Sequence, residues 1–154
     1  MQTQIRPAIA NDAPAAVGLM AQLAEYGHGQ VDSGVEDRFR AMLELPQHAI
    51  FVAEDDSGQV VGLLTISHRW TLWHAGPCAL IEELVVDEGA RGRGIGRALI
   101  QAALAWAETQ GCSEVEVSTE LDNTTAQAFY RRLGFTSEAL LLEYEFFEPS
   151  CLSG

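Results

Sequence analysis

The spacing of apolar residues along the chain predicts an alternation of β-strands and α-helices. Segments in which apolar and polar residues alternate, or in which apolar residues run together between turn-forming residues, are typical of strands. Segments with apolar residues three or four positions apart are typical of amphipathic helices. The predicted strands cover residues 3–9, 48–54, 59–68, 79–86 and 114–118, and residues 135–147 are predicted to be extended.

Four helices are predicted between these strands, over residues 11–26, 33–45, 98–110 and 123–134. The first begins at an Asn-Asp pair and the last at an asparagine, and both residue types accept hydrogen bonds from free helix N–H groups. The second begins with Ser-Gly-Val-Glu, which fits a capping box, and the proline at position 46 ends it. Glycines at the ends of the third and fourth helices are typical of helix C-termini.

This order of elements predicts an α/β (α+β) fold, with one layer of sheet flanked by helices. The chain has the length of one domain and contains no repeat, linker or low-complexity tract. Residues 1–154 are therefore predicted to form a single domain. The strands over 48–68 are expected to form a hairpin, and the aromatic segment 69–77 is expected to be a loop or a strand edge.

The charge of the chain restricts its partners. The chain carries nine arginines and no lysine, and its formal net charge is −13. A polyanion would be repelled, so nucleic-acid binding is not expected. A cationic substrate such as an amine would be attracted, although the same charge would also serve solubility alone.

Other features of the composition favour a cytoplasmic protein. No run of 18 apolar residues is present, so no membrane span is expected. The N-terminus lacks the apolar core of a signal peptide. Cys78, Cys112 and Cys151 are far apart without a CxxC spacing, which favours reduced thiols over a disulfide framework or a zinc site.

A glycine-rich turn, Arg91-Gly92-Arg93-Gly94-Ile95-Gly96-Arg97, separates the predicted strand 79–86 from the predicted helix 98–110. A helix N-terminus presents free N–H groups and the positive end of the helix dipole, and it therefore binds anions. Glycines let a phosphate approach the backbone closely. The turn matches neither a P-loop nor the dinucleotide-binding fingerprint. We interpret it as a pyrophosphate cradle, the alternative being a turn that only redirects the chain.

A second motif, Asn123-Thr124-Thr125-Ala126-Gln127-Ala128-Phe129-Tyr130-Arg131-Arg132-Leu133-Gly134-Phe135, follows the cradle in the chain. The two motifs, in this order and after an apolar strand, resemble the GNAT superfamily of acyl-CoA-dependent N-acetyltransferases. The resemblance covers roughly residues 3–147 and is sharpest over 80–135. It implies a GNAT fold with a central mixed sheet of six to seven strands, flanked by about four helices, whose central parallel pair is splayed apart.

The resemblance also implies which residues hold acetyl-CoA, the expected co-substrate. The backbone N–H groups of residues 91–97 would bind its pyrophosphate. Leu84, Val85 and Val86 would offer their backbone to the pantetheine arm and the thioester carbonyl, where one N–H would act as a minimal oxyanion hole. Asn123 matches a position that contacts the cofactor arm, and it could equally be a plain N-cap.

Three residues are candidates for proton transfer. Tyr130 matches the family's general acid for the coenzyme A thiolate, unless it only packs beside Phe129. Glu82 and Glu83 are candidates for the base that deprotonates the amine, because burial within an apolar strand would raise the pKa of a carboxyl. Adjacent strand residues point to opposite faces, so only one glutamate is expected at the site unless a bulge intervenes. Glu83 is slightly favoured.

Several aromatic and histidine residues could line the acceptor site, although ordinary packing or surface positions would explain each equally well. They are Tyr26, His28, His68, Trp70, Trp73 and His74. Their spacing fits no strong metal motif, and no metal is expected. The run 68–86 is most similar to aminoalkylphosphonate N-acetyltransferases, and Arg69 would then bind the phosphonate. An aminoglycoside, polyamine or amino-acid amine suits the acidic chain at least as well.

The sequence thus predicts direct acetyl transfer to a primary amine of a small molecule. Two alternatives remain open. A protein acetyltransferase would act on N-terminal or lysine amines, but the bulky segment 69–77 argues against an open peptide groove. A non-catalytic acyl-CoA-binding module could lack Tyr130 and the glutamates, so their presence favours an enzyme. Neither Cys78 nor Cys112 has a visible histidine partner, so no acyl-enzyme is expected. The apolar run 140–142 could support a homodimer.

Overall fold

The computed structural model describes residues 2–26 and 29–146, and it divides into two units. The first unit comprises Met1–Glu116 and the second comprises Val117–Gly154. The predicted order of strands and helices is confirmed along the chain, with differences at some element ends and in the number of strands. No helix within the described ranges is both long and apolar enough to cross a membrane.

One sheet of five strands has the order β1-β2-β3-β4-β5. Each of the first four strands pairs antiparallel with its neighbour in this order. The strands are β1 (Thr3–Pro7), β2 (His48–Asp55), β3 (Val60–Arg69), β4 (Cys78–Val86) and β5 (Glu114–Val117).

The expectation of six to seven strands is wrong for the described residues, because residues 135–146 contain no strand. Apolar and polar residues alternate toward the end of this segment, as they do in a strand. A strand also needs a partner with which to form a hydrogen-bonded ladder, and alternation alone supplies none.

The helices are α1 (Ala13–Tyr26), α2 (Val35–Leu43), α3 (Ile95–Thr109) and α4 (Thr124–Arg132), with short 3-10 turns η1 (Ala10–Asp12) and η2 (Glu88–Ala90). The predicted capping box of α2 is wrong, because Gly34 occupies the N-cap position and no side chain caps the helix. Instead, Oδ1 of Asp32 accepts a hydrogen bond of 2.7 Å from the N–H of Gly34.

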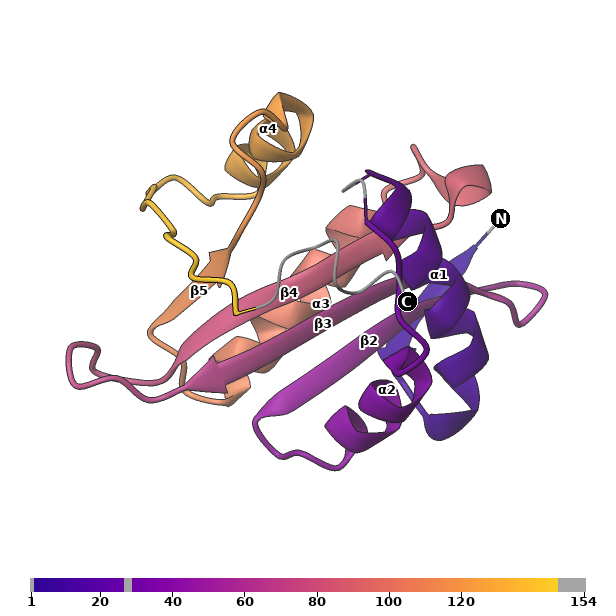
Figure 1. The fold of residues 1–154 in the computed structure, drawn as a ribbon, viewed down its shortest axis with the longest axis horizontal. Coiled ribbons are helices and arrows are strands. Elements are labelled where there is room, and N and C mark those ends of the chain that lie inside the picture. The colour runs from indigo at the N-terminus through magenta and orange to yellow at the C-terminus, as the bar shows by residue number, and fades with distance from the viewer. Residues whose placement is uncertain (1, 27–28, 147–154) are drawn as a thin grey trace. The chain divides into compact units, whose positions relative to one another are not determined.

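In the first unit, α1 and α2 cover one face of the sheet and α3 covers the other (Figure 1). The core beneath α1 and α2 consists of Ala13, Ala16, Leu19, Phe39, Ile50, Val52, Leu63 and Val85. On the opposite face, α3 lies so close to β3 that a Cβ added to Gly62 would be 3.1 Å from Leu99 and 3.2 Å from Ile95. The sheet is thus held between two apolar layers.

An ion pair ties β1 to η1, the turn that immediately precedes α1. Two nitrogens of Arg6 donate to the carboxylate of Asp12 at 2.8 and 2.9 Å, and Arg6 Nε donates to Glu54 at 2.8 Å. Asp12 was predicted to cap the first helix by accepting from N–H groups that follow it. Its carboxylate instead accepts from the N–H of Ile9, three residues earlier in the chain, at 2.8 Å. The hydrogen bond from Arg6 is the main reason that the pKa of Asp12 is lowered.

Candidate active site

A β-bulge in β4 brings Glu82 and Glu83 to the same face of the sheet. Thr65 of β3 pairs with Glu83, whereas the next residue, Ile66, pairs with Ile81. Glu82 is therefore the extra residue of the bulge. The alternation of side chains then restarts at Glu83. The prediction that only one glutamate would face the site held unless a bulge intervened, and a bulge is present here.

The register identifies this face. Leu63 and Val85 are paired and belong to the core under α1 and α2. Thr65 and Glu83 lie two residues from them along their strands and therefore share their face. Ser67, two residues after Thr65, lies on the same face and pairs with Leu80. Glu82 follows Leu80 by two residues and therefore lies on this face as well. The charge of Glu83 also raises the pKa of Glu82, which is consistent with two neighbouring carboxylates.

The two glutamates have different surroundings. Glu83 is half-buried, and its carboxylate accepts a hydrogen bond from Oγ1 of Thr65, which is only 5 % exposed. The same hydroxyl accepts from the backbone N–H of Glu83 at 3.2 Å. Thr65 thus uses both the donor and an acceptor of its hydroxyl to hold Glu83 in place.

Glu82 is exposed, yet nearby protein atoms displace part of its water shell. This desolvation is the main cause of its raised pKa, and the negative charge of Glu83 adds to it. His48 and Arg69 act in the opposite direction. A carboxylate with a raised pKa that solvent can reach is a better proton acceptor than an ordinary surface glutamate.

The glycine-rich turn has the conformation that an anion cradle requires. Gly92 and Gly94 have φ values of 75° and 78°, which favour glycine, and Gly94 is the N-cap of α3. A Cβ added at either position would have no atom within 4 Å, so the space beside both glycines is open. The helix starts at Ile95 and not at Ala98 as predicted, so its free N–H groups lie within the turn. Arg93 and Arg97 are exposed. These residues fit a pyrophosphate.

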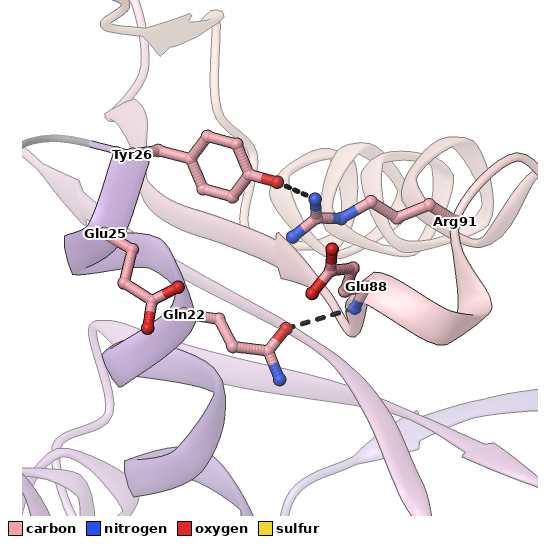
Figure 2. Close-up of a pocket in the computed structure, with 5 residues that line it drawn as sticks. All are labelled: Gln22, Glu25, Tyr26, Glu88 and Arg91. Carbon is pink, nitrogen blue, oxygen red and sulfur yellow. Dashed lines mark hydrogen bonds between the residues drawn. The ribbon is translucent and has the colours of Figure 1, made fainter.

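Arg91, the first residue of the turn, is held in place by two other elements. Its Nε donates to the carbonyl of Val86 at 3.0 Å, and its Nη1 donates to the hydroxyl of Tyr26 at the end of α1. The guanidinium carbon lies 4.7 Å from the centre of the tyrosine ring. Figure 2 shows these side chains pointing toward one another across a small pocket.

Gln22 makes a second connection between α1 and the segment after β4. Its amide nitrogen donates to Asp87 at 2.9 Å, and its amide oxygen accepts from the N–H of Glu88 at 3.1 Å. The pocket between the two connections has a volume of about 170 Å³ and is lined by Gln22, Glu25, Tyr26, Glu88 and Arg91 (Figure 2). The end of α1 and the entry to the cradle are therefore joined at two points.

The second unit contains the predicted residues Asn123 and Tyr130. Oδ1 of Asn123 accepts from the N–H of Ala126 at 3.0 Å and caps α4, as predicted. The Tyr130 ring packs edge-on against Phe129 and Phe135, with ring centres 5.2 and 5.6 Å apart. Burial raises the pKa of the Tyr130 phenol, so it stays protonated at neutral pH. The functional roles of both residues stay predictions.

The candidate acceptor residues are not gathered in one place. His68 pairs with Ala79 on the α3 face, and its ring lies 5.5 Å from that of Trp106. It is thus on the opposite face from the glutamates. Trp70 and Trp73 lie in the exposed loop after β3, with 73 % and 89 % of their surface accessible. Tyr26 contacts Arg91, and His28 lies outside the described residues.

His74 and Arg69, which were also candidates for the acceptor site, each have a partner within the protein. Nδ1 of His74 lies 2.8 Å from the hydroxyl of Thr71, and Arg69 forms an ion pair of 3.4 Å with Glu116. Over the described ranges, no group of three or more histidine, cysteine or acidic residues could hold a metal ion.

Two residues that organise the site, Thr65 and Gln22, are not among those predicted from the sequence. Thr65 is a polar residue in the middle of an apolar strand, which was a readable signal for a buried hydrogen bond. Gln22 gave no such signal, because a glutamine on a helix is ordinarily exposed and its partners lie far away in the sequence.

Comparisons with known proteins agree with this geometry. The profile of the Acetyltransferase (GNAT) family matches residues 18–135. An aminoglycoside N(6')-acetyltransferase type 1 of Serratia marcescens is 30 % identical over 108 residues, which cover 68 % of this chain and 74 % of that protein. A mycothiol acetyltransferase of Arthrobacter sp. (strain FB24) is 38 % identical over 90 residues, but these cover 55 % of this chain and only 26 % of that protein.

A solved structure of AAC(6')-Iy, in complex with the bisubstrate analogue CoA-S-monomethyl-acetylneamine, superimposes with a TM-score of 0.81. It is 26 % identical and covers 94 % of this chain and 98 % of its own length. The family match, the sheet and helices of the fold, and the open glycine turn before α3 lead to one conclusion. The chain belongs to the GNAT family of acetyltransferases, and it is an N-acetyltransferase that uses acetyl-CoA.

Proposed function

We propose that this enzyme acetylates a primary amine of a small, polycationic molecule, with aminoglycosides as the first class to test. The observation that carries the proposal is the pair of carboxylates, Glu82 and Glu83, on one face of β4. Two neighbouring carboxylates suit an acceptor with several ammonium groups, and the net charge of −13 would attract such a molecule. The similarity of this chain to the aminoglycoside N(6')-acetyltransferase of Serratia marcescens and to AAC(6')-Iy supports this class.

Glu82 is proposed as the base. An amine reaches the site mainly as an ammonium ion and cannot attack until it loses a proton. Glu82 is exposed and has a raised pKa, so it accepts that proton directly or through a water molecule. Glu83, held by Thr65, supplies a fixed negative charge that raises the proton affinity of Glu82 and attracts the ammonium group.

The remaining steps use the cradle and the second unit. Acetyl-CoA supplies the acetyl group as a thioester: the amine nitrogen forms the new N–C bond as the C–S bond breaks. The N–H groups of the turn around Gly92 and Gly94 hold the pyrophosphate, and the backbone of residues 84–86 orients the thioester end. Tyr130 gives its phenolic proton to the departing sulfur. Asn123 is proposed to contact the cofactor arm in addition to capping α4.

Both units are proposed to act as a single acetyltransferase domain over residues 1–154. The matched family region, 18–135, begins in the first unit and ends in the second. It includes the cradle as well as the motif that contains Tyr130. An N-terminal fragment that kept full turnover without the second unit would contradict this proposal.

The test is turnover of acetyl-CoA, measured as free thiol release, across a panel of amines. The panel includes aminoglycosides, polyamines, amino acids, aminoalkylphosphonates and a lysine peptide. We expect an aminoglycoside to exceed the others in kcat/KM, and Glu82→Gln to reduce that value by about 10²–10⁴-fold at neutral pH. Turnover of the peptide alone would move the assignment to a protein acetyltransferase. Coenzyme A binding without turnover of any amine would favour the binding module.

A further inference from the structure

We propose that Tyr26 is a positioning residue for acetyl-CoA binding, because it holds the Arg91 guanidinium at the entrance to the glycine-rich turn before the cofactor arrives. The proposal assigns to Tyr26 a role on the cofactor side of the site, in contrast to the acceptor-lining role expected from the sequence. It rests on the proposed function of the turn as a pyrophosphate cradle.

The contacts of Arg91 define the geometry of this arrangement. The Val86 carbonyl fixes Nε, the Tyr26 hydroxyl fixes Nη1, and the guanidinium carbon lies 4.7 Å from the centre of the tyrosine ring. A guanidinium has five N–H donors. Within the described residues these bonds use two of them, and the others remain available to an anionic ligand.

Preorganisation is the physical reason that these contacts should matter for binding. Both side chains lie at the surface, and Tyr26 is 64 % exposed. A free surface arginine samples many rotamers, and a ligand that orders it loses part of its binding free energy. The ring and hydroxyl of Tyr26 restrict those rotamers in advance. Arg91 immediately precedes Gly92, so a fixed Arg91 also presents its charge beside the N–H groups of the cradle.

The position of Tyr26 is itself fixed by α1. Gln22 lies one helical turn before Tyr26 and is bonded to both Asp87 and Glu88 (Figure 2). These bonds hold the last turn of α1 against the segment that leads into the cradle. Tyr26 therefore contacts Arg91 from a helix end that is itself held in place. A contact between two side chains on unanchored segments would not have this support.

The test compares coenzyme A affinity, measured by isothermal titration calorimetry, with the steady-state KM values of both substrates. Tyr26→Phe keeps the ring and loses the hydroxyl, whereas Tyr26→Ala loses both. We expect the dissociation constant of coenzyme A to rise about threefold to tenfold in Tyr26→Phe, and further in Tyr26→Ala. The KM for the amine should stay unchanged. Tyr144→Phe, which alters an exposed tyrosine packed on Phe146, serves as the matched control and should bind like wild type.

A double-mutant cycle separates positioning from a general structural effect. If Tyr26 acts through Arg91, then Tyr26→Phe should have no further effect on coenzyme A affinity in an Arg91→Ala chain. The same fold loss in both backgrounds would overturn the proposal. A raised KM for the amine with unchanged coenzyme A affinity would also overturn it and would return Tyr26 to the acceptor site. Failure of wild type to bind coenzyme A would overturn the proposed function and this inference together.

Discussion

Replacing Thr65 by valine tests whether its hydroxyl fixes Glu83 in the bulge. Valine has nearly the same shape as threonine, so the substitution removes the hydroxyl and leaves the packing of β3 almost unchanged. Two interactions are lost: the hydrogen bond to the Glu83 carboxylate and the acceptor for the Glu83 backbone N–H. Thr65 is buried, so water cannot fully replace its hydroxyl at this point.

The size of the effect follows from these two bonds. A hydrogen bond to a charged group contributes about 1.5–3 kcal/mol, and partial exposure of Glu83 places this one near the lower value. The weakened backbone interaction adds about 1 kcal/mol, and the higher strand propensity of valine offsets a few tenths. We therefore expect a loss of about 2 kcal/mol in the free energy of unfolding, and a Tm about 4–8 °C lower for a chain of this length.

Urea unfolding and thermal melts of Thr65→Val, Thr65→Ser and Glu83→Gln measure this loss. Thr65→Ser keeps the hydroxyl and should lose only the small contribution of one methyl group. In a Glu83→Gln chain, the cost of Thr65→Val should shrink, because the charged partner is absent. The reasoning is refuted if Thr65→Val has the same Tm as wild type, or if its cost is the same in both backgrounds.

Three further predictions concern other parts of the first unit. Folding raises the pKa of Glu82, so ionisation of its carboxyl lowers the stability of the fold as pH rises above about 4.5. Glu82→Gln should therefore have a higher Tm than wild type near pH 7 and the same Tm near pH 3.5. Equal Tm values for the variant and wild type at pH 7 would contradict this. Gly94→Ala should cost about 1 kcal/mol of stability and weaken coenzyme A binding in calorimetry, whereas Gly58→Ala, at a φ of 81° in the β2–β3 turn, should show only the stability loss. Asp12→Asn should cost about 2 kcal/mol in urea unfolding at neutral pH, because Arg6 loses one of its two charged partners and keeps only Glu54. The pKa of Asp12 is lowered in the folded chain, so this advantage of wild type should begin to decline as pH falls below about 4 and should be lost as pH falls through the folded pKa. A cost that did not depend on pH would argue against the ion pair.

The elements and the cradle could be predicted because their signals are local. Gly92 and Gly94 are followed by an amphipathic helix, and the structure shows both the positive φ values and the helix start. The face on which His68 lies could not be predicted in this way. Residues 61–66 of β3 are all buried, so the alternation that would separate the two faces is absent from the strand.

The bulge is a second feature that the sequence conceals. Two adjacent glutamates in an apolar strand look the same whether one of them faces each side or both face the same side. The difference lies in how Thr65 and Ile66 pair with β4, and pairing depends on the neighbouring strand. The connections from Gln22 to Asp87 and from Tyr26 to Arg91 are concealed for the same reason, since each joins segments far apart in the chain.

The bulge also has a consequence for the tolerance of β4 to changes in length. Leu84 and Val86 pair with β3 on the α3 face, as Ala79 and Ile81 do, although one extra position separates the two halves of the strand. Deleting the codon for residue 82 would give a regular strand that keeps this apolar row intact and retains a single carboxylate. Inserting a residue into β4 ahead of Glu82 would instead turn the following part of the strand over and direct the glutamates toward α3. This strand should therefore tolerate the loss of one residue from the Glu82–Glu83 pair far better than the loss of a residue at its other positions.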